Sequence, residues 1–484
     1  MKKLTDILKN TPVREVCGDT AAAIGGLVYD SRAVKPGDCF FAVPGTQSDG
    51  HDYIPIAVEK GAAAIVCERM PADAAEGVAY VLVGDSAGAM ADMAAAFYDY
   101  PSRELKLVGI TGTNGKTTTA TLLYDLVRAM GYKAGLISTV VYKIDGREVE
   151  ATHTTPDSIR LNAMMREMAD AGCAYCFMEC SSHAIVQERT RGLDFAGGIF
   201  SNITHDHLDY HKTFAEYIRA KKLFFDGLPK GAFALTNADD RNGRVMVQNT
   251  AAAVSAYSLR AMADFRCKIV EMHLDGMLLR IDGQELWVGL LGRFNAYNLL
   301  AVYGAAVLLG LDRGEVLRVL SMLHAVSGRF EKIRAANGTT AIVDYAHTPD
   351  ALENVIQTIE EIRTPGPQLI VVCGCGGDRD RTKRPEMAAI AVKYATTAVF
   401  TSDNPRHESP EAILDDMVAG LEPGARYLRI ADRAEAIRTA VMLSRPGDII
   451  LVAGKGHETY QIVGDVKHPF DDREEIKKRF ALLN

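Results

Sequence analysis

The stretch Leu105 to Leu123, LKLVGITGTNGKTTTATLL, decides the fold of this chain. Its apolar first part, Leu105 to Ile110, predicts a buried strand, a glycine-rich turn follows, and the run from Lys116 onward is compatible with a helix. A strand, a glycine loop and a helix N-terminus in this order form a phosphate cradle, because backbone N–H groups and the helix dipole both favour an anion there. We therefore expect Lys116 to reach the terminal phosphates of a nucleotide and the Thr117 hydroxyl to hold Mg²⁺.

The glycine loop departs in one detail from the common P-loop pattern. Gly-x4-Gly-Lys-Thr needs a glycine at position 110, where this chain has Ile110, and the glycines are Gly109, Gly112 and Gly115 instead. The alternative is an ordinary strand-to-helix turn with a surface lysine. The predicted strand before the loop and the predicted helix after it favour nucleotide binding.

Length and composition indicate a globular protein of about three domains, since domains have about 100–200 residues each and the chain has 484, of which 48% are hydrophobic. The net charge of −8 and the lack of a basic stripe argue against nucleic-acid binding. No apolar run approaches the ~20 residues of a membrane span. The N-terminus, MKKLTDILKN, has no apolar segment of a signal peptide, so we expect a cytoplasmic protein.

The order of predicted elements indicates an α/β fold with three domains. Residues 1–102 form a small N-terminal α/β domain, residues 103–330 a central P-loop ATPase-type domain with a mostly parallel sheet, and residues 331–484 a C-terminal doubly wound, Rossmann-like domain. In the central domain we expect strands near residues 134–138, 175–182, 197–204 and 232–236, then strand pairs over 265–291. In the C-terminal domain we expect strands at residues 341–344, 369–373, 398–402, 426–430 and, as the last one, 448–453.

Nine cysteines, an odd number, lie mostly in apolar stretches and are expected to be reduced core residues. The spacing of Cys173, Cys176, Cys180 and His183 could suggest zinc. Residues 175–182 read as a buried strand, in which side chains alternate between faces, so four ligands could not easily converge.

Polar clusters follow two predicted strands of the central domain, at residues 179–183 and 202–209. Each places carboxylates and imidazoles where the Mg²⁺ of a bound nucleotide would lie, and Glu179 is a better Mg²⁺ ligand than His207 because Mg²⁺ prefers oxygen. The alternative is that these residues cap helices. A third segment, residues 220–225, contains Lys221 and Lys222 and by itself indicates only a solvated helix face.

Three glycine-containing polar loops follow strands of the C-terminal domain, at residues 374–381, 403–406 and 454–458. Arginine forks in these loops can clamp carboxylates, and Glu458 can bind an ammonium group. A ligand with both groups, such as an amino acid, fits this pocket. The alternative is a set of glycine turns with incidental charge.

These motifs together resemble the Mur ligases, the ATP-dependent amide ligases of peptidoglycan precursor synthesis, along nearly the whole chain. The resemblance covers TGTNGKTT at 111–118, ECSSH at 179–183, DHLDYH at 206–211, GRFNAYN at 292–298 and DYAHTP at 344–349. DNPR at 403–406 resembles the signature of those members that add meso-2,6-diaminopimelate to UDP-N-acetylmuramoyl-L-alanyl-D-glutamate.

The resemblance implies a role for each matching residue. The uridine end of the substrate would face Ser31, with Asp30, Arg32 and His51 nearby, and the muramoyl-dipeptide would contact Thr154, Thr155, Ser181, Gln187 and Arg189. ATP would be bound by Gly112, Thr113, Asn114, Gly115, Lys116, Thr117, Thr118, Asn298, Arg329 and Asp344. The diamino acid would be bound by Arg379, Asp403, Asn404, Pro405, Arg406, Gly454 and Glu458. The chain departs from the family at His153, where the usual pattern is Asn-Thr-Thr-Pro.

The resemblance also implies a metal site and a modified lysine. Mg²⁺ would be held by Thr117, Glu179, His207 and Lys221, and Lys221 matches the carbamylated lysine (N6-carboxylysine) of the family. A carbamate is an anionic oxygen ligand, which a plain ammonium is not. Catalysis would then depend on Lys116, Lys221, His207 and Glu179.

The expected reaction joins the diamino acid to the D-glutamate γ-carboxylate through an acyl phosphate, in a protein expected to act as a monomer. Three alternatives stay open: the same ligase using L-lysine, a folylpolyglutamate-type ligase, and a nucleotide-dependent switch. Arg406 argues against lysine, which has no distal carboxylate to pair with a buried guanidinium. The Asp-Asn-Pro-Arg loop and a separate N-terminal domain argue against the folylpolyglutamate type.

Overall fold

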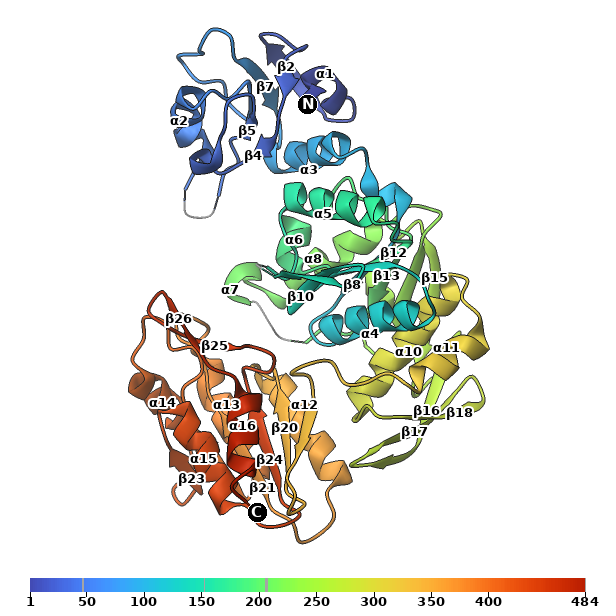
Figure 1. The fold of residues 1–484 in the computed structure, drawn as a ribbon, viewed down its shortest axis with the longest axis vertical. Helices are drawn as coiled ribbons and strands as arrows, with labels where there is room; N and C mark the ends of the chain where they lie inside the picture. The colour runs from blue at the N-terminus through green and yellow to red at the C-terminus, as the bar shows by residue number, and fades with distance from the viewer. Residues whose placement is uncertain (46–47, 152, 205–207, 484) are drawn as a thin grey trace.

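The computed structural model describes residues 1–45, 48–151, 153–204 and 208–483. Three α/β bodies follow one another along the long axis, with the N-terminal one in blue, the central one in green and yellow, and the C-terminal one in orange and red (Figure 1). Each body has its own large sheet of five, eleven or six strands. The expected α/β fold with three domains is confirmed. We propose domain limits near residues 102 and 330, where the chain passes from one sheet to the next.

The N-terminal body is a five-stranded sheet in the order β2-β7-β6-β5-β4, parallel except for β2. Its strands are β2 Val13–Cys17, β4 Leu27–Val28, β5 Cys39–Phe41, β6 Ala64–Cys67 and β7 Ala79–Val83. Its helices are α1 Leu4–Ile7, α2 Ile54–Glu59 and α3 Ser86–Phe97, with a small pair of strands, β1 Lys2–Lys3 and β3 Ala23–Ile24. Asp85 caps α3 by accepting the Gly88 N–H, and α3 lies against α5 (Ser158–Asp170) of the central body (Figure 1).

The central sheet has the order β11-β10-β9-β12-β8-β13-β14-β15-β16-β17-β18. The middle of the sheet, from β9 to β16, is parallel, and antiparallel hairpins form both edges. Its parallel strands are β8 Lys106–Thr111, β9 Ala134–Ile137, β12 Tyr175–Glu179, β13 Gly197–Phe200, β14 Phe233–Asn237, β15 Ala253–Ser258 and β16 Phe265–His273. The edge strands are β10 Val141–Ile144, β11 Arg147–Glu150, β17 Gly276–Ile281 and β18 Gln284–Val288.

Helices cover the two faces of the central sheet, as expected for a mostly parallel sheet. Besides α5 they are α4 Lys116–Ala129, α6 Ser182–Val186, α7 Leu208–His211, α8 Phe214–Asp226, α9 Gly243–Met246, α10 Arg293–Leu308 and α11 Arg313–Leu320. The predicted strand over residues 175–182 was wrong beyond Glu179. The Ser181 side chain accepts the Ala184 N–H and starts α6, because a serine at this position caps a helix.

The C-terminal sheet has the order β19-β20-β24-β21-β22-β23 and is parallel except for β19. Its strands are β19 Glu331–Arg334, β20 Thr340–Asp344, β21 Leu369–Cys373, β22 Thr397–Phe400, β23 Tyr427–Arg429 and β24 Ile449–Ala453. Its helices are α12 Pro349–Ile362, α13 Lys383–Tyr394, α14 Pro410–Val418, α15 Arg433–Leu443 and α16 Asp472–Phe480. The expectation that β24 is the last strand was wrong, because a hairpin of β25 (Tyr460–Val463) and β26 (Val466–Pro469) follows it.

The central and C-terminal bodies share one hydrophobic core, which includes Val326 and Phe330 from the connection between them. The cysteines are free, and all but the half-buried Cys17 are buried. Burial raises the pKa of the Cys176 and Cys180 thiols, and no metal-binding group of His, Cys, Asp and Glu occurs among the described residues. Reduced core cysteines are thus confirmed, and the zinc interpretation finds no support within those ranges.

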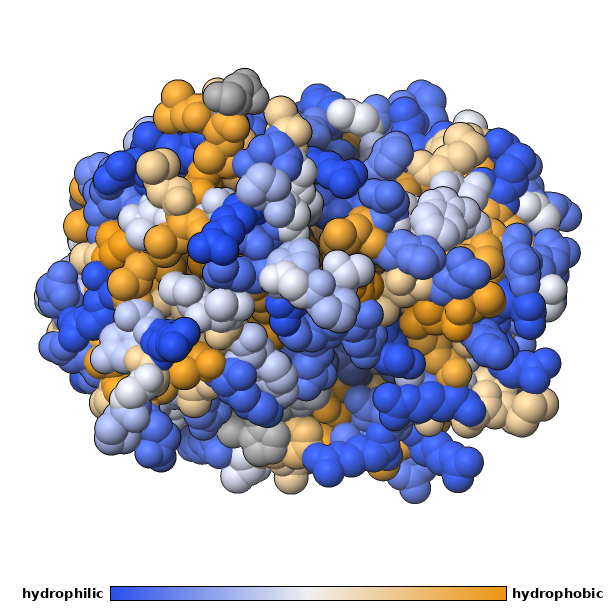
Figure 2. All heavy atoms as spheres, turned by 90° about the horizontal axis from the view of Figure 1, so that it is seen from below, coloured by the Kyte–Doolittle hydropathy of each residue, from blue (hydrophilic) through white to orange (hydrophobic). Residues whose placement is uncertain are grey.

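The surface is a mixture of hydrophilic and hydrophobic side chains on the face seen from below (Figure 2). Among the described residues, no helix is both long and apolar enough to cross a membrane.

Candidate functional site

The glycine loop lies at the carboxyl end of β8, between β12 and β13 in the middle of the central sheet. Gly112 (φ +150°) and Gly115 (φ +87°) adopt backbone angles that favour glycine, and a Cβ on Gly112 would lie 2.0 Å from Ser201 Oγ. Helix α4 begins at Lys116, directly after Gly115. The predicted strand, glycine loop and helix N-terminus are therefore confirmed, and the loop has the form of an anion cradle.

Two lysine side chains reach the glycine loop. Lys116 Nζ donates to the carbonyl oxygens of Gly112 (3.0 Å) and Thr113 (2.8 Å), and Lys221 Nζ donates to the carbonyl of Gly112 (2.8 Å). Lys221 is only 1% exposed. The interpretation of residues 220–225 as a solvated helix face was therefore wrong for this residue. Lys222, one position on, pairs with Asp226 instead. The Lys116 ammonium at this loop is suited to a polyphosphate.

Glu179 ends β12 with its carboxylate turned inward, and the residue is 1% exposed. It accepts hydrogen bonds from the Thr139 N–H (2.7 Å) and the Thr139 hydroxyl (3.2 Å). Thr117, Glu179 and Lys221 line the same cavity, so the structure brings together three of the four predicted metal ligands. The fourth, His207, lies outside the described residues. A carboxylate and a hydroxyl facing one cavity fit the preference of Mg²⁺ for oxygen.

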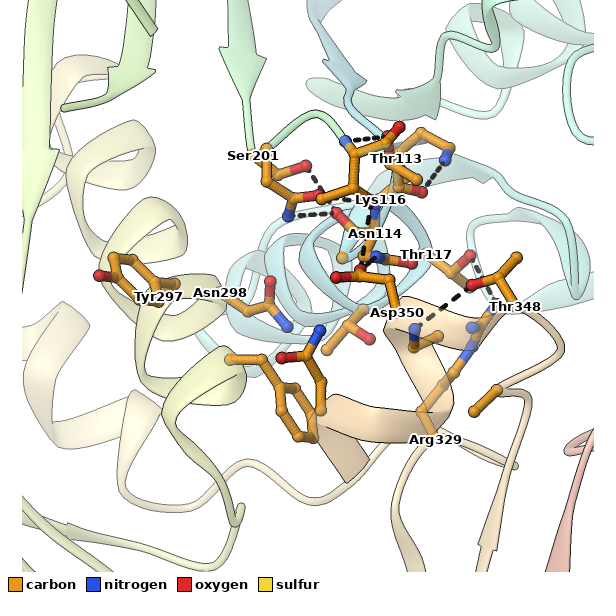
Figure 3. A pocket seen from close by; sticks show the side chains of 18 of the residues that line it. Thr113, Asn114, Lys116, Thr117, Ser201, Tyr297, Asn298, Arg329, Thr348 and Asp350 are labelled. Carbon is orange, nitrogen blue, oxygen red and sulfur yellow. Dashed lines mark hydrogen bonds between the residues drawn. The ribbon is translucent and has the colours of Figure 1, made fainter. Parts of the chain in front are cut away.

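The cavity that adjoins the glycine loop has a volume of about 920 Å³ and lies between the central body and α12 of the C-terminal body (Figure 3). Arg329 Nη2 donates to the Thr117 hydroxyl (3.2 Å). The predicted ATP-binding residues that line this cavity are Thr113, Asn114, Gly115, Lys116, Thr117, Thr118, Asn298, Arg329 and Asp344. The remaining one, Gly112, is the acceptor of both lysines rather than part of the lining.

Asp350, in the first turn of α12, is a site residue that sequence reasoning missed. Its Oδ2 accepts hydrogen bonds from Asn114 Nδ2 (2.9 Å) and from the Thr204 hydroxyl (3.2 Å), which Figure 3 shows for Asn114. Burial raises the pKa of this carboxyl group. The contact joins the C-terminal body to the glycine loop. Its only signal in the sequence is the position directly after Pro349.

Asp344, at the carboxyl end of β20, is buried and organises the connection between the two bodies. Its Oδ2 accepts the Phe330 N–H (2.7 Å) and its Oδ1 accepts the Ala346 N–H (2.8 Å). Burial raises the pKa of the Asp344 carboxyl, and the nearby Arg329 opposes this rise. Asp344 therefore holds the backbone next to Arg329 and Tyr345, which line the cavity.

The predicted muramoyl-dipeptide residues lie near Glu179. Thr155 donates to the Glu179 carbonyl (2.7 Å), Arg189 Nη1 donates to the Thr155 carbonyl (2.7 Å), and Arg189 Nη2 donates to Gln187 Oε1. Ser181 and Thr154 line the same cavity as Glu179. The structure thus groups all five of these predicted residues on one side of the glycine loop.

The predicted uridine residues lie in the N-terminal body, and His51 there has an internal role. Its Nε2 accepts the Glu68 N–H (2.9 Å), so its Nδ1 carries the hydrogen and donates to Asp49 Oδ1 (2.7 Å). Both ring nitrogens of His51 are used within the N-terminal body, and its place beside the uridine stays a prediction. Ser31 starts a short 3-10 helix, Ser31–Ala33, that Asp30 caps.

A second cavity, of about 1140 Å³, lies at the carboxyl ends of β24, β21 and β22, which are neighbours in the sheet. Such an edge is where open α/β sheets bind ligands. The predicted amino-acid-binding residues that line it are Arg379, Asp403, Asn404, Arg406, Gly454 and Glu458. The three glycine-containing loops do meet in one pocket, and Pro405 lies outside its lining. Both this cavity and the cavity at the glycine loop are lined by Thr204, Tyr345, His347, Thr348 and Asp350.

The β25–β26 hairpin, which the sequence did not predict, holds the backbone of Arg406. The Arg406 N–H donates to the Ile462 carbonyl (3.1 Å), and the Arg406 carbonyl accepts the Gly464 N–H (2.8 Å). The residue adopts a positive φ of 50°, and its Nη1 donates to the Gly377 carbonyl (2.8 Å). The guanidinium is thereby held at the cavity wall by two loops.

A buried ion pair stands behind the loops of the second cavity. Arg433 and Asp472 are both buried, and Arg433 Nε lies 2.7 Å from Asp472 Oδ1. The two Nη groups of Arg433 donate to the carbonyls of Ser402 (3.3 Å) and Ala453 (3.0 Å). These carbonyls directly precede the loops at residues 403–406 and 454–458, which follow β22 and β24. Arg433 therefore fixes the first residues of both loops.

Comparison with known proteins agrees with this geometry. Residues 23–98 match the family described as Mur ligase family, catalytic domain, residues 110–306 match the Mur ligase middle domain, and residues 328–456 match the Mur ligase, glutamate ligase domain. The chain is 55% identical over 481 residues to a protein of Phocaeicola vulgatus named UDP-N-acetylmuramoyl-L-alanyl-D-glutamate–2,6-diaminopimelate ligase, with 99% of each chain covered. The chain belongs to the Mur ligase family.

Two further relatives of this Mur ligase carry the same name. One, of Bacteroides fragilis, is 55% identical over 482 residues, with 99% of each chain covered. A solved structure with that title is 31% identical, covers 100% of this chain and 99% of its own, and superimposes with a TM-score of 0.71. The protein is therefore an ATP-dependent, amide-bond-forming ligase of the Mur type.

Proposed function

We propose that this Mur ligase joins meso-2,6-diaminopimelate to the D-glutamate γ-carboxylate of UDP-N-acetylmuramoyl-L-alanyl-D-glutamate, with ATP converted to ADP and phosphate. The observation that carries the proposal is the pair of adjoining cavities, one at the glycine loop and one that has both arginines and carboxylates in its lining. They share Thr204, Tyr345, His347, Thr348 and Asp350 as walls. The name of the close relatives supports the same substrates.

The first step activates the substrate carboxylate. The γ-carboxylate of D-glutamate attacks the γ-phosphorus of ATP, the bond to the β,γ-bridging oxygen breaks, and an acyl phosphate and ADP form. Charge on the transferred group is the main obstacle in phosphoryl transfer, and Lys116 beside Gly112 and Thr113 is placed to neutralise it. Thr155, Gln187 and Arg189 would hold the muramoyl-dipeptide on the Glu179 side of the loop.

The second step forms the amide. The neutral amine of the diamino acid attacks the acyl carbon, phosphate leaves with the bonding electrons, and the amine loses a proton. The opposite charges of the second cavity fit this substrate, with Arg406 and Arg379 for its two carboxylates and Glu458 and Asp403 for its free ammonium. L-lysine lacks the distal carboxylate and would leave Arg406 without a partner.

Mg²⁺ fits the oxygen donors at the glycine loop. Thr117 and Glu179 would hold it, together with Lys221 as the carbamate and His207, and it would neutralise phosphate charge. Carbamylation needs a neutral amine, and Lys221 is a buried lysine at the glycine loop. Mass spectrometry of the intact protein under CO₂ tests this modification, with Lys221→Met as the variant that should lose the added mass.

Phosphate release tests the proposal as a whole. The assay contains ATP, Mg²⁺ and UDP-N-acetylmuramoyl-L-alanyl-D-glutamate, with meso-diaminopimelate, L-lysine or no amino acid. We expect release that depends on diaminopimelate. Release with lysine alone would keep the family and overturn the substrate, whereas release that ignores the amino acid would overturn the role of the second cavity.

A further inference from the structure

Lys455 is a fully buried lysine directly behind the wall of the second cavity. It is 0% exposed and is not part of the cavity lining, although Gly454 and Glu458 on either side are. Its Nζ donates to Glu458 Oε2 (2.7 Å) and to Asn404 Oδ1 (3.0 Å). A buried ammonium is costly unless it is paired and hydrogen-bonded, so both contacts are needed to keep it in place.

The two acceptors of Lys455 belong to different loops of the pocket. Glu458 Oε2 accepts from Lys455 and also from Asn404 Nδ2 (2.9 Å), whereas Glu458 Oε1 accepts no hydrogen bond from the residues that the structure describes. Asn404 Oδ1 accepts from Lys455 and from the Ile462 N–H (3.0 Å). The loop at 403–406, the loop at 454–458 and the β25–β26 hairpin therefore meet at Lys455.

We infer that Lys455 is a positioning residue that fixes Glu458 with its Oε1 turned toward the ligand and locks the 403–406 loop to the 454–458 loop. This inference rests on the proposed function, because the ligand is the diamino acid that the second cavity would bind. Lys455 cannot touch that ligand itself, since it lies behind the wall. Without its ammonium, Glu458 would lose its charged partner and turn toward water, and the free ammonium of the ligand would lose a fixed carboxylate.

The test compares Lys455→Met with Lys467→Met. Methionine keeps the length of the side chain and removes the charge. Lys467 is a matched control, because it is exposed on β26 and, like Lys455, has its ammonium near the ring of Tyr460. We expect Lys455→Met to raise the KM for diaminopimelate about tenfold or more, with the KM values for ATP and for the nucleotide substrate within about twofold of wild type. Lys467→Met should change none of them.

A double-mutant cycle separates positioning from a general loss of structure. In a Glu458→Gln background the carboxylate is already gone, so adding Lys455→Met should raise the KM for diaminopimelate by less than about threefold. The inference would be overturned if Lys455→Met raised the KM for diaminopimelate by the same factor with and without Glu458→Gln. It would also be overturned if the KM values for diaminopimelate, ATP and the nucleotide substrate all rose together. If circular dichroism shows that Lys455→Met does not fold, Lys455→Gln takes its place. We then expect the same result, a raised KM for diaminopimelate and nearly unchanged KM values for ATP and the nucleotide substrate. Failure of the proposed function itself would look different, since the wild-type enzyme would then release no phosphate with diaminopimelate.

Discussion

Arg406 is the residue on which the choice of amino acid depends. Its backbone is held by the β25–β26 hairpin and its guanidinium lies at the second cavity. We expect Arg406→Ala to raise the KM for diaminopimelate about 10- to 100-fold, because a hydrogen bond to a charged group is worth about 1.5–3 kcal/mol. The KM for ATP should stay unchanged, and Arg438→Ala, at an exposed ion pair on α15, is the control. Equal effects on both substrates would contradict this role.

His457 makes stability depend on pH. Burial, together with Arg329 and Arg473, lowers its pKa from 6.5 to about 3. The unfolded chain therefore binds a proton that the folded protein does not between about pH 6.5 and 3, so stability falls as the pH falls through that window. From pH 7 to pH 5 the loss due to His457 is about 2 kcal/mol. Urea unfolding of wild type and of His457→Gln should show a smaller loss for the variant. Identical losses of stability in wild type and His457→Gln would contradict this prediction.

At the residue scale, the sequence predicted which residues lie at the glycine loop better than it predicted the contacts that hold site residues in place. The glycine-loop residues from Thr113 to Thr118, which line the first cavity, were predicted, because a strand, a glycine loop and a helix have a local signature. The burial of Lys221 and the internal hydrogen bonds of His51 depend on what packs around them in three dimensions. No spacing in the sequence reveals that Asp350 meets Asn114 across the two bodies.

Helix α12 is the element that joins the two cavities. Asp350 in its first turn bonds Asn114 and Thr204. Asp350→Ala removes two hydrogen bonds worth about 1 kcal/mol each, so the closed arrangement of α12 over the loop should be less populated. We expect kcat to fall about five- to thirtyfold with little change in the unfolding temperature. Glu360→Ala on the same helix, which breaks only the pair with Arg363, is the control. A similar loss of kcat in both variants would exclude a specific role.

At the element scale, the buried parallel strands and the strand pairs over residues 265–291 were predicted, whereas the hairpins β10–β11 and β25–β26 were not. Strands such as β21 and β24 are continuous apolar runs of Ile, Leu and Val that end in Cys or Ala and are buried on both faces, which is a strong signal. The strands β11 and β26 are mostly exposed and polar, so they lack the alternation that marks a half-buried strand. The hairpin β25–β26 is nevertheless what supports Arg406.

At the scale of the whole molecule, the central and C-terminal bodies should respond to a nucleotide together. They share one hydrophobic core, Arg329 reaches Thr117, and Lys332 donates to the Leu274 carbonyl (2.9 Å). A non-hydrolysable ATP analogue at 100 times its Kd stabilises the state that binds it by about 2.7 kcal/mol. Because its cavity is walled by both bodies, hydrogen exchange should slow in α4 and α12 alike, while β5 to β7 of the N-terminal body exchange as before. Protection confined to α4 would contradict the prediction, because it would show that the nucleotide binds to the central body alone.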